Sequence, residues 1–143
     1  MTEVVRQDCL AAAAAHVAVK TAVEAGRAIG CAMAAAVVDA GGNLIAFLRD
    51  NGAYLSSGSV AEDKAFTAAS FGVSTLDLAN RVDGNARVRE AMAHRDRVVL
   101  LNGGLPIRVE GRLVGGIGVS GGTGEQDAEC ASAALAAIGA DAG

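Results

Sequence analysis

Aromatic side chains are scarce in this sequence, which has no Trp, one Tyr and three Phe among its 143 residues. Hydrophobic residues make up 52% of the chain, but many of them are alanine. The core must therefore be built from small side chains, and each of these buries little apolar area. Because a lean core often gains stability from subunit contacts, we expect a homo-oligomer.

Concentrated positive charge is also missing. The twelve Lys and Arg are scattered among sixteen Asp and Glu, and the formal net charge is −4. No basic run can follow a phosphate backbone, and few rings are available for bases to stack on. We therefore expect no nucleic acid partner.

Long apolar runs are absent as well. No stretch reaches the roughly 18 to 20 residues that a membrane helix needs. The start, MTEVVRQDCL, lacks the charged head and apolar run of a signal peptide. We expect a cytoplasmic protein with no membrane partner, and the length predicts one domain over residues 1–143.

The three cysteines, Cys9, Cys31 and Cys130, are far apart in the sequence and form no CxxC pair. Together with only two histidines they do not make a zinc or non-haem iron site. We expect no metal site, and we expect the cysteines to act as small hydrophobic side chains.

The first half of the chain shows one helical pattern, two short apolar runs and a second helical pattern. Residues 5–29 predict a helix with one polar and one apolar face. The runs 31–39 and 44–49 flank a Gly-Gly turn and predict a β-hairpin. A loop over 51–59 precedes a helix over 60–71, which Ser59 and Glu62 would start as a capping box.

The second half predicts a short helix over 75–81, capped by Ser74, and then three strands and a closing helix. The predicted strands are 98–101, 105–109 and 112–119, and the predicted helix is 124–138. Pro106 indicates an edge strand or a bulge. The whole order predicts an α+β fold, in which a five-stranded antiparallel sheet carries flanking helices.

The stretch GGIGVSGG, residues 115–122, matches the G-x-G-x-x-G spacing of a dinucleotide loop. That site needs its glycines between a strand and a helix, with an acid about 20 residues later on a second parallel strand. Gly116 and Gly118 instead fall inside the last predicted strand. Nucleotide binding is therefore excluded here, and the glycines indicate close approach of either a helix or a ligand.

Four motifs carry a family resemblance: DAGGNLIAF, EDKAFTAASF, NGGLPI and GGIGVSGGTGEQD, in this order. Together they resemble the GlcG/HbpS family of haem-degrading or haem-binding domains. The C-terminal domain of PduO-type corrinoid adenosyltransferases is one branch of it. The resemblance implies a profilin-like fold with five antiparallel strands, oligomers and haem binding. Some members are linked to corrinoid metabolism or redox sensing, and others to catabolic genes.

Two segments hold most of the candidate site residues. Lys64 and Thr67 lie in the EDKAFTAASF motif, and Lys64 is either a pocket residue or half of an ion pair with Asp39, Asp50 or Asp127. The strand end at Arg49 is either a solvated terminus or a rim that grips a carboxylate such as a haem propionate. The catalytic candidates are Lys64, Asp127 and His94, and the ligand-binding candidates are Arg49, Asp50, Tyr54, Thr67, Gly121, Gly122 and Glu125.

Haem ligation has weak support in the residues themselves. In some family members the segment that matches STLDL carries a histidine proposed to ligate haem iron, and here that position is Leu76. His16 shares a polar helix face with Lys20, so we expect it in solvent, whereas His94 is freer. Met33 and Met92 are substitute ligands without positional support.

Three functions therefore remain open. The resemblance favours a protein that binds a small molecule, with haem or a related tetrapyrrole as its ligand. The alternative is a cofactor-independent isomerase, tautomerase or lyase acting on a small anionic metabolite. Lys64 and Arg49 would bind that substrate, and Asp127, Asp50 or His94 would act as the general base. An oligomeric scaffold is a third class that no residue singles out.

Overall fold

The computed structural model describes residues 1–143 and confirms the α+β class, with an antiparallel sheet and flanking helices. None of its helices combines the length and the hydropathy needed to cross a membrane. The elements in chain order are α1 (Ala12–Ala28), β1 (Ala34–Asp39), β2 (Leu44–Arg49), α2 (Leu55–Phe71), α3 (Thr75–Asp83), α4 (Ala86–Ala93), β3 (Gly104–Val109), β4 (Arg112–Ser120) and α5 (Gly124–Ala137).

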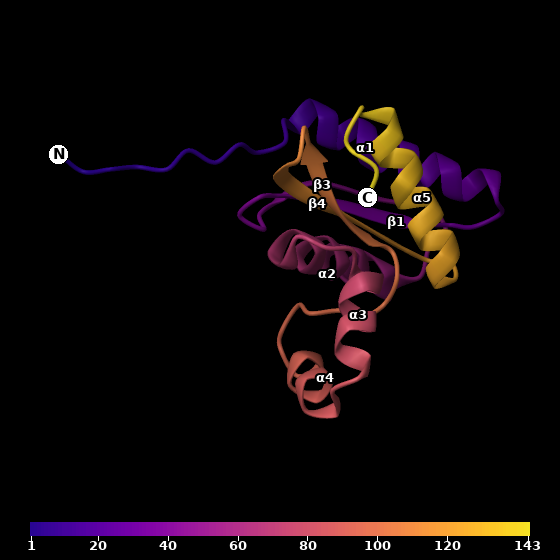
Figure 1. The fold of residues 1–143 in the computed structure, drawn as a ribbon. Helices are drawn as coiled ribbons and strands as arrows, with labels where there is room; N and C mark the ends of the chain where they lie inside the picture. The colour runs from indigo at the N-terminus through magenta and orange to yellow at the C-terminus, as the bar shows by residue number, and fades with distance from the viewer.

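The sheet has the order β2-β1-β4-β3, and each neighbouring pair is antiparallel. Helices α1 and α5 cover one face and α2 covers the other, while α3 and α4 extend beyond the sheet (Figure 1). Side chains alternate along β1, so this strand contributes to the packing on both faces of the sheet. Ala35 and Val37 join the core under α1 and α5, whereas Ala36 and Val38 join a smaller cluster under α2.

Glycines of β4 let α2 lie unusually close to the sheet. A Cβ built on Gly118 would stand 2.0 Å from the carbonyl oxygen of Ala61, and one on Gly116 would stand 2.4 Å from that of Ala65. Only hydrogen fits at these positions. The object that approaches the last strand is therefore a helix of the same chain, and not a ligand.

The expected fifth strand at 98–101 does not form, so the prediction of five strands was wrong. The Thr67 hydroxyl donates to the carbonyl oxygen of Arg97 at 2.8 Å and accepts from the amide of Val99 at 3.0 Å. This holds the segment against α2. The outer edge of β3 is also occupied in part, because the amide of Asp141 donates to the carbonyl oxygen of Arg108.

Helix α1 begins at Ala12 and not at residue 5 as predicted. Residues 1–9 are exposed, and the amide of Leu10 donates to the carbonyl oxygen of Val114 at 3.0 Å, which keeps the chain extended there. The polar face is confirmed, since His16 and Lys20 are exposed. The apolar face faces the core, and its buried residues are Ala15, Ala18, Val19, Ala22, Val23 and Gly26.

Helix α2 begins at Leu55, earlier than predicted, so the capping box of Ser59 and Glu62 does not form. The sequence of its first turns is rich in Ser and Gly, which are poor helix formers. Tertiary packing outweighs this preference, because Ser57 and Gly58 are buried and Gly58 lies against the ring of Phe47.

Several local signals are confirmed. Ser74 caps α3 by accepting from the amide of Asp77, and Thr123 forms a capping box with Gln126 at the start of α5. Pro106 lies in β3, which is an edge strand with a register shift after Ile107. These features depend on a few neighbouring residues, and so the sequence alone predicts them.

Candidate functional site

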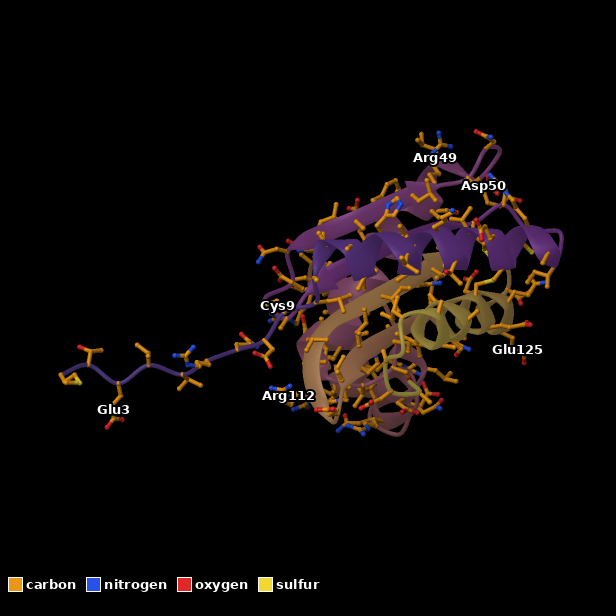
Figure 2. All side chains as sticks on the ribbon, turned by 90° about the horizontal axis from the view of Figure 1, so that it is seen from above. Glu3, Cys9, Arg49, Asp50, Arg112 and Glu125 are labelled. Carbon is orange, nitrogen blue, oxygen red and sulfur yellow. The ribbon has the colours of Figure 1, made fainter.

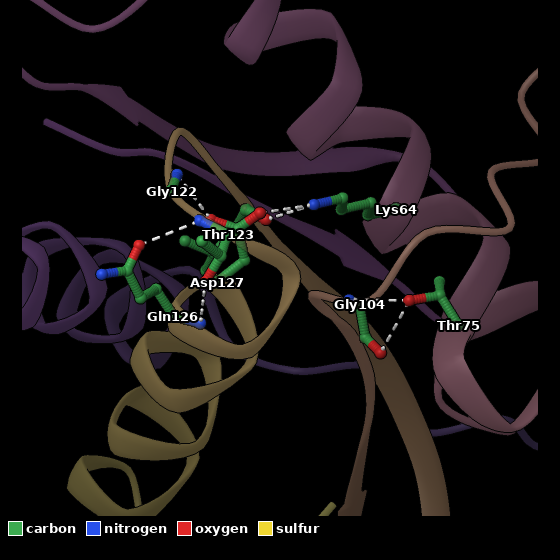
Figure 3. Close-up of polar contacts among 8 residues, drawn as sticks. Lys64, Thr75, Gly104, Gly122, Thr123, Gln126 and Asp127 are labelled. Carbon is green, nitrogen blue, oxygen red and sulfur yellow. Dashed lines mark hydrogen bonds and ion pairs between the residues drawn. The ribbon is translucent and has the colours of Figure 1, made fainter. Parts of the chain in front are cut away.

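The most deeply buried charges are Lys64 of α2 and Asp127 of α5, which form an ion pair. The Lys64 Nζ lies 2.9 Å from Asp127 Oδ2, and the two side chains are only 3% and 5% exposed. The same Nζ donates to the carbonyl oxygen of Val119 at 2.9 Å. The pair therefore joins both faces of the sheet through the end of β4 (Figure 3).

The first turn of α5 holds Asp127 in place. The Thr123–Gln126 capping box fixes the start of this helix. The amide of Gly122 donates to Asp127 Oδ1 at 2.9 Å, so both carboxylate oxygens have partners. The preceding Gly121 has φ 140°, a conformation that favours glycine. Gly121 and Gly122 thus act through the turn that orients the carboxylate.

Backbone encloses the pair from the side of β3. A Cβ built on Gly103 would stand 2.8 Å from Lys64 Nζ and 2.8 Å from the Asp127 Cβ, and one on Gly104 would stand 2.6 Å from the Lys64 carbonyl oxygen. Thr75 helps to enclose the pair on this side, because its hydroxyl oxygen accepts a hydrogen bond from the amide of Gly104 at 3.0 Å. Neither of the hollows in the protein is lined by Lys64 or Asp127. The arrangement neutralises two charges and offers no room for a substrate beside them.

Arg49, Asp50 and Tyr54 lie together where β2 leads into α2. Arg49 is exposed at the margin of the molecule (Figure 2), and its Nη1 donates to the carbonyl oxygen of Ala53 at 3.1 Å. Tyr54 is 74% exposed. Asp50 is buried, and its carboxylate accepts hydrogen bonds from Nε and Nη2 of Arg27 at 2.9 and 2.6 Å. Arg27 is the partner that the sequence did not reveal, because no local spacing connects it to Asp50.

The Arg27 guanidinium holds the pKa of Asp50 below its ordinary value by donating hydrogen bonds to the carboxylate. The pair therefore stabilises the fold above the unfolded pKa of about 4, and this contribution disappears as the pH falls through the folded pKa. In an Arg27→Gln variant we expect the Asp50 pKa to rise and this part of the acid destabilisation to vanish.

Carbon-detected NMR titration of the Asp50 carboxyl, together with urea midpoints across the acid range, measures both effects. Lys20→Gln on the exposed face of the same helix serves as the control and should leave the Asp50 titration unchanged. An Asp50 pKa that is the same with and without Arg27 would contradict the assignment.

The remaining candidates form no hydrogen bond or ion pair with Lys64 or Asp127. His94 follows the last residue of α4, a helix with no buried residue, and it is exposed. Glu125 is exposed on the first turn of α5 (Figure 2). Thr67 is buried, and its hydroxyl holds the segment after α4. Leu76, at the position where some relatives have histidine, is 42% exposed.

The three cysteines are free thiols in different environments. Burial raises the pKa of the Cys130 thiol to about 11, and the nearby carboxylates of Glu129 and Asp127 contribute. This thiol stays protonated at neutral pH and packs as a small hydrophobic side chain. Cys9 is exposed and Cys31 is half-buried, so the expectation of apolar packing holds for Cys130 and is wrong for Cys9.

Two hollows are present at the surface. The first, of about 390 Å³, lies where the N-terminal segment meets β4 and is lined by Arg6, Gln7, Asp8, Arg112 and Leu113. The second, of about 190 Å³, lies between α5 and the C-terminal residues. Neither contains any of the candidate site residues.

Known proteins with the same architecture are similar to this chain over most of its length. A double mutant of HbpS from Streptomyces reticuli is 36% identical, with a TM-score of 0.85 over 93% of this chain and 89% of that one. A complex of PduOC with heme is 32% identical, with a TM-score of 0.87 over 94% of this chain and 98% of that one.

Sequence comparison points to the same group. The corrinoid adenosyltransferase PduO of Salmonella typhimurium is 34% identical over 124 residues, which cover 86% of this chain but only 37% of PduO. The family model described as haem degrading protein HbpS-like matches residues 10–136. The chain therefore belongs to the HbpS-like family.

Proposed function

We propose that this chain binds haem or a related tetrapyrrole. The observation that carries the proposal is its similarity to a domain whose structure contains heme, with the same fold over nearly the whole of both chains. The likeness to HbpS and the match to the HbpS-like family support it further. Fold alone would not support a ligand, but identity above 30% over this length is a closer relation than a shared fold.

The donor groups of the chain suit a haem iron in part. Imidazole is a common axial ligand of haem. The side chains of His16 and His94 are both exposed. The exposed guanidinium of Arg49 suits a propionate, and the ring of Tyr54 beside it suits the edge of a macrocycle.

Neither of the two surface hollows suits a haem. Cofactor pockets usually have about 300 to 1,000 Å³ and a mostly apolar lining. The larger hollow has only one hydrophobic lining residue, Leu113, and the smaller one has about 190 Å³. We therefore propose that the ligand binds on an exposed surface of the chain and in neither of these hollows.

The enzyme alternative has less support. Its three catalytic candidates do not share a hollow, because Lys64 and Asp127 are enclosed together and His94 is exposed on another element. The carboxylate of Asp127 already binds an ammonium group and an amide, which leaves it poorly suited to act as a general base.

Titration of the purified protein with hemin tests the proposal. We expect a saturable Soret shift, because protein ligation moves the haem absorption away from that of free hemin. Removing the ligating histidine in His16→Ala or His94→Ala should change the Soret position and weaken binding at least about tenfold. Arg49→Ala should weaken binding without moving the Soret maximum.

Lys20→Ala is the matched control, since it removes an exposed side chain from the helix that carries His16. A hemin spectrum that does not respond to the protein, or that changes without saturation, would overturn haem binding. Equal spectra for both histidine variants and the parent would exclude histidine as the ligand.

A further inference from the structure

The larger of the two hollows forms where the N-terminal segment leaves the sheet. The amide of Leu10 donates to the carbonyl oxygen of Val114 at 3.0 Å, which ties this segment to β4. Residues 1–11 belong to no helix or strand, and before Leu10 the chain leads away from the sheet (Figure 1). The hollow of about 390 Å³ lies between the departing segment and the start of β4.

Positive charge gathers in the lining of this hollow. Arg6, Gln7 and Asp8 come from the N-terminal segment, and Arg112 is the first residue of β4. Leu113 is the one hydrophobic residue of the lining. Two guanidinium groups against one carboxylate give the lining a net charge of +1, although the formal net charge of the whole chain is −4.

Both arginines are accessible to a ligand from solvent. Arg112 pairs with Asp8, and the two side chains are 65% and 53% exposed. Ion pairs this exposed contribute little to stability, so an anion readily replaces Asp8 as the partner of Arg112. Arg6 is exposed as well, and the lining contains no second carboxylate to neutralise it. Figure 2 shows Arg112 beside the point where the N-terminal segment leaves the body of the molecule.

We propose that this hollow binds a small oxyanion with two negative charges, of the phosphate or dicarboxylate class, between Arg6 and Arg112. A guanidinium presents parallel N–H donors that match the oxygens of a phosphate or a carboxylate, and such charge-assisted hydrogen bonds are strong ones. The side-chain amide of Gln7 is a further donor in the same lining. A polar lining with one apolar residue suits a small hydrophilic ligand and does not suit a macrocycle.

The bound oxyanion joins the N-terminal segment to β4 at a second point. The backbone bond from Leu10 to Val114 is the first, and Arg6 lies four residues before it. A ligand that binds Arg6 and Arg112 together therefore restrains the segment between them, and amide exchange of residues 6–8 should slow when the site is filled. The site uses none of the residues assigned to haem, so the two proposals succeed or fail separately.

Titration of the apo protein with inorganic phosphate, followed by heteronuclear NMR, tests the site. Sodium succinate replaces phosphate in a second titration, and sodium chloride keeps the ionic strength constant in both. We expect saturable shifts of the Nε–Hε signals of Arg6 and Arg112. Arg112→Gln and Arg6→Gln should each weaken binding about tenfold, because each removes hydrogen bonds between charged partners.

Asp8→Asn should have the opposite effect. It removes the carboxylate that competes for Arg112, so we expect binding to tighten about threefold. Arg87→Gln and Asp96→Asn are the matched controls, because they change the net charge by the same amounts at exposed residues outside the hollow. Both controls should bind the oxyanion as the parent does.

Shifts that rise linearly with phosphate and with succinate, without saturation, would overturn the proposal. Equal weakening in Arg112→Gln and Arg87→Gln would also overturn it, because the effect would then belong to net charge and not to the hollow. Saturation by phosphate alone assigns the site to a phosphate group, and saturation by succinate alone assigns it to a dicarboxylate. Hemin is absent from these titrations, so a negative result leaves the haem proposal intact.

Discussion

Replacing Asp127 by alanine is expected to lower the free energy of unfolding by about 3 to 5 kcal/mol. The change removes the carboxylate that pairs with the buried Lys64 ammonium group. Its ammonium group is 3% exposed and would keep only the Val119 carbonyl oxygen as a partner. The amide of Gly122 would lose its acceptor as well. An uncompensated buried charge is among the few defects that cost this much.

Urea unfolding of the parent and the variant measures the difference. Glu24→Ala is the control, because Glu24 pairs with Lys20 at 3.9 Å with both side chains more than half exposed. Such a pair contributes about 0.5 kcal/mol or less. A loss of the same small size in Asp127→Ala would show that water reaches the buried pair.

The double variant Lys64→Met, Asp127→Leu separates the charges from the packing. Apolar residues of similar volume often replace a buried ion pair without loss of stability. We therefore expect the double variant to be more stable than Asp127→Ala. Retained hemin binding in a folded double variant would assign the pair to the architecture, whereas lost binding would return it to the ligand site.

Gly118→Ala is expected to destabilise the protein by about 3 kcal/mol or more, at the upper end for overpacked cores. The added methyl group would stand 2.0 Å from the Ala61 carbonyl oxygen and 2.6 Å from the Ala65 amide nitrogen. Both atoms belong to the backbone of α2, so no side-chain rotation can relieve the contact. The helix must move away from the sheet, and the cluster of alanines between them must open.

The matched control is Gly84→Ala at the end of α3. Gly84 has φ −79° and ψ −1°, and a Cβ there would meet nothing within 4 Å. Alanine at such a position changes stability by about 1 kcal/mol at most, and in the stabilising direction. Thermal and urea unfolding of both variants compare the two sites. If Gly118→Ala were as stable as Gly84→Ala, the close packing of α2 on β4 would be wrong.

The helix boundaries show where sequence reasoning fails. The caps at Ser74 and Thr123 were predictable because each uses a side chain and an amide only three residues apart. The start of α2 was not, since Gly58 becomes helical by packing against Phe47 from another element. The missing strand at 98–101 also involves a tertiary contact, because the Thr67 hydroxyl of α2 binds the carbonyl oxygen of Arg97 and the amide of Val99.

The sequence by itself determined the α+β class, both hairpins, the family and the presence of glycines at close approach. Those features depend on local patterns and on composition. Only the tertiary structure decided that α2 packs against Gly118, that Lys64 forms its ion pair with Asp127, and that Asp50 forms its ion pair with Arg27. Charges far apart in a chain have several possible partners of opposite sign. Which of them meet depends on the packing of the elements that carry them.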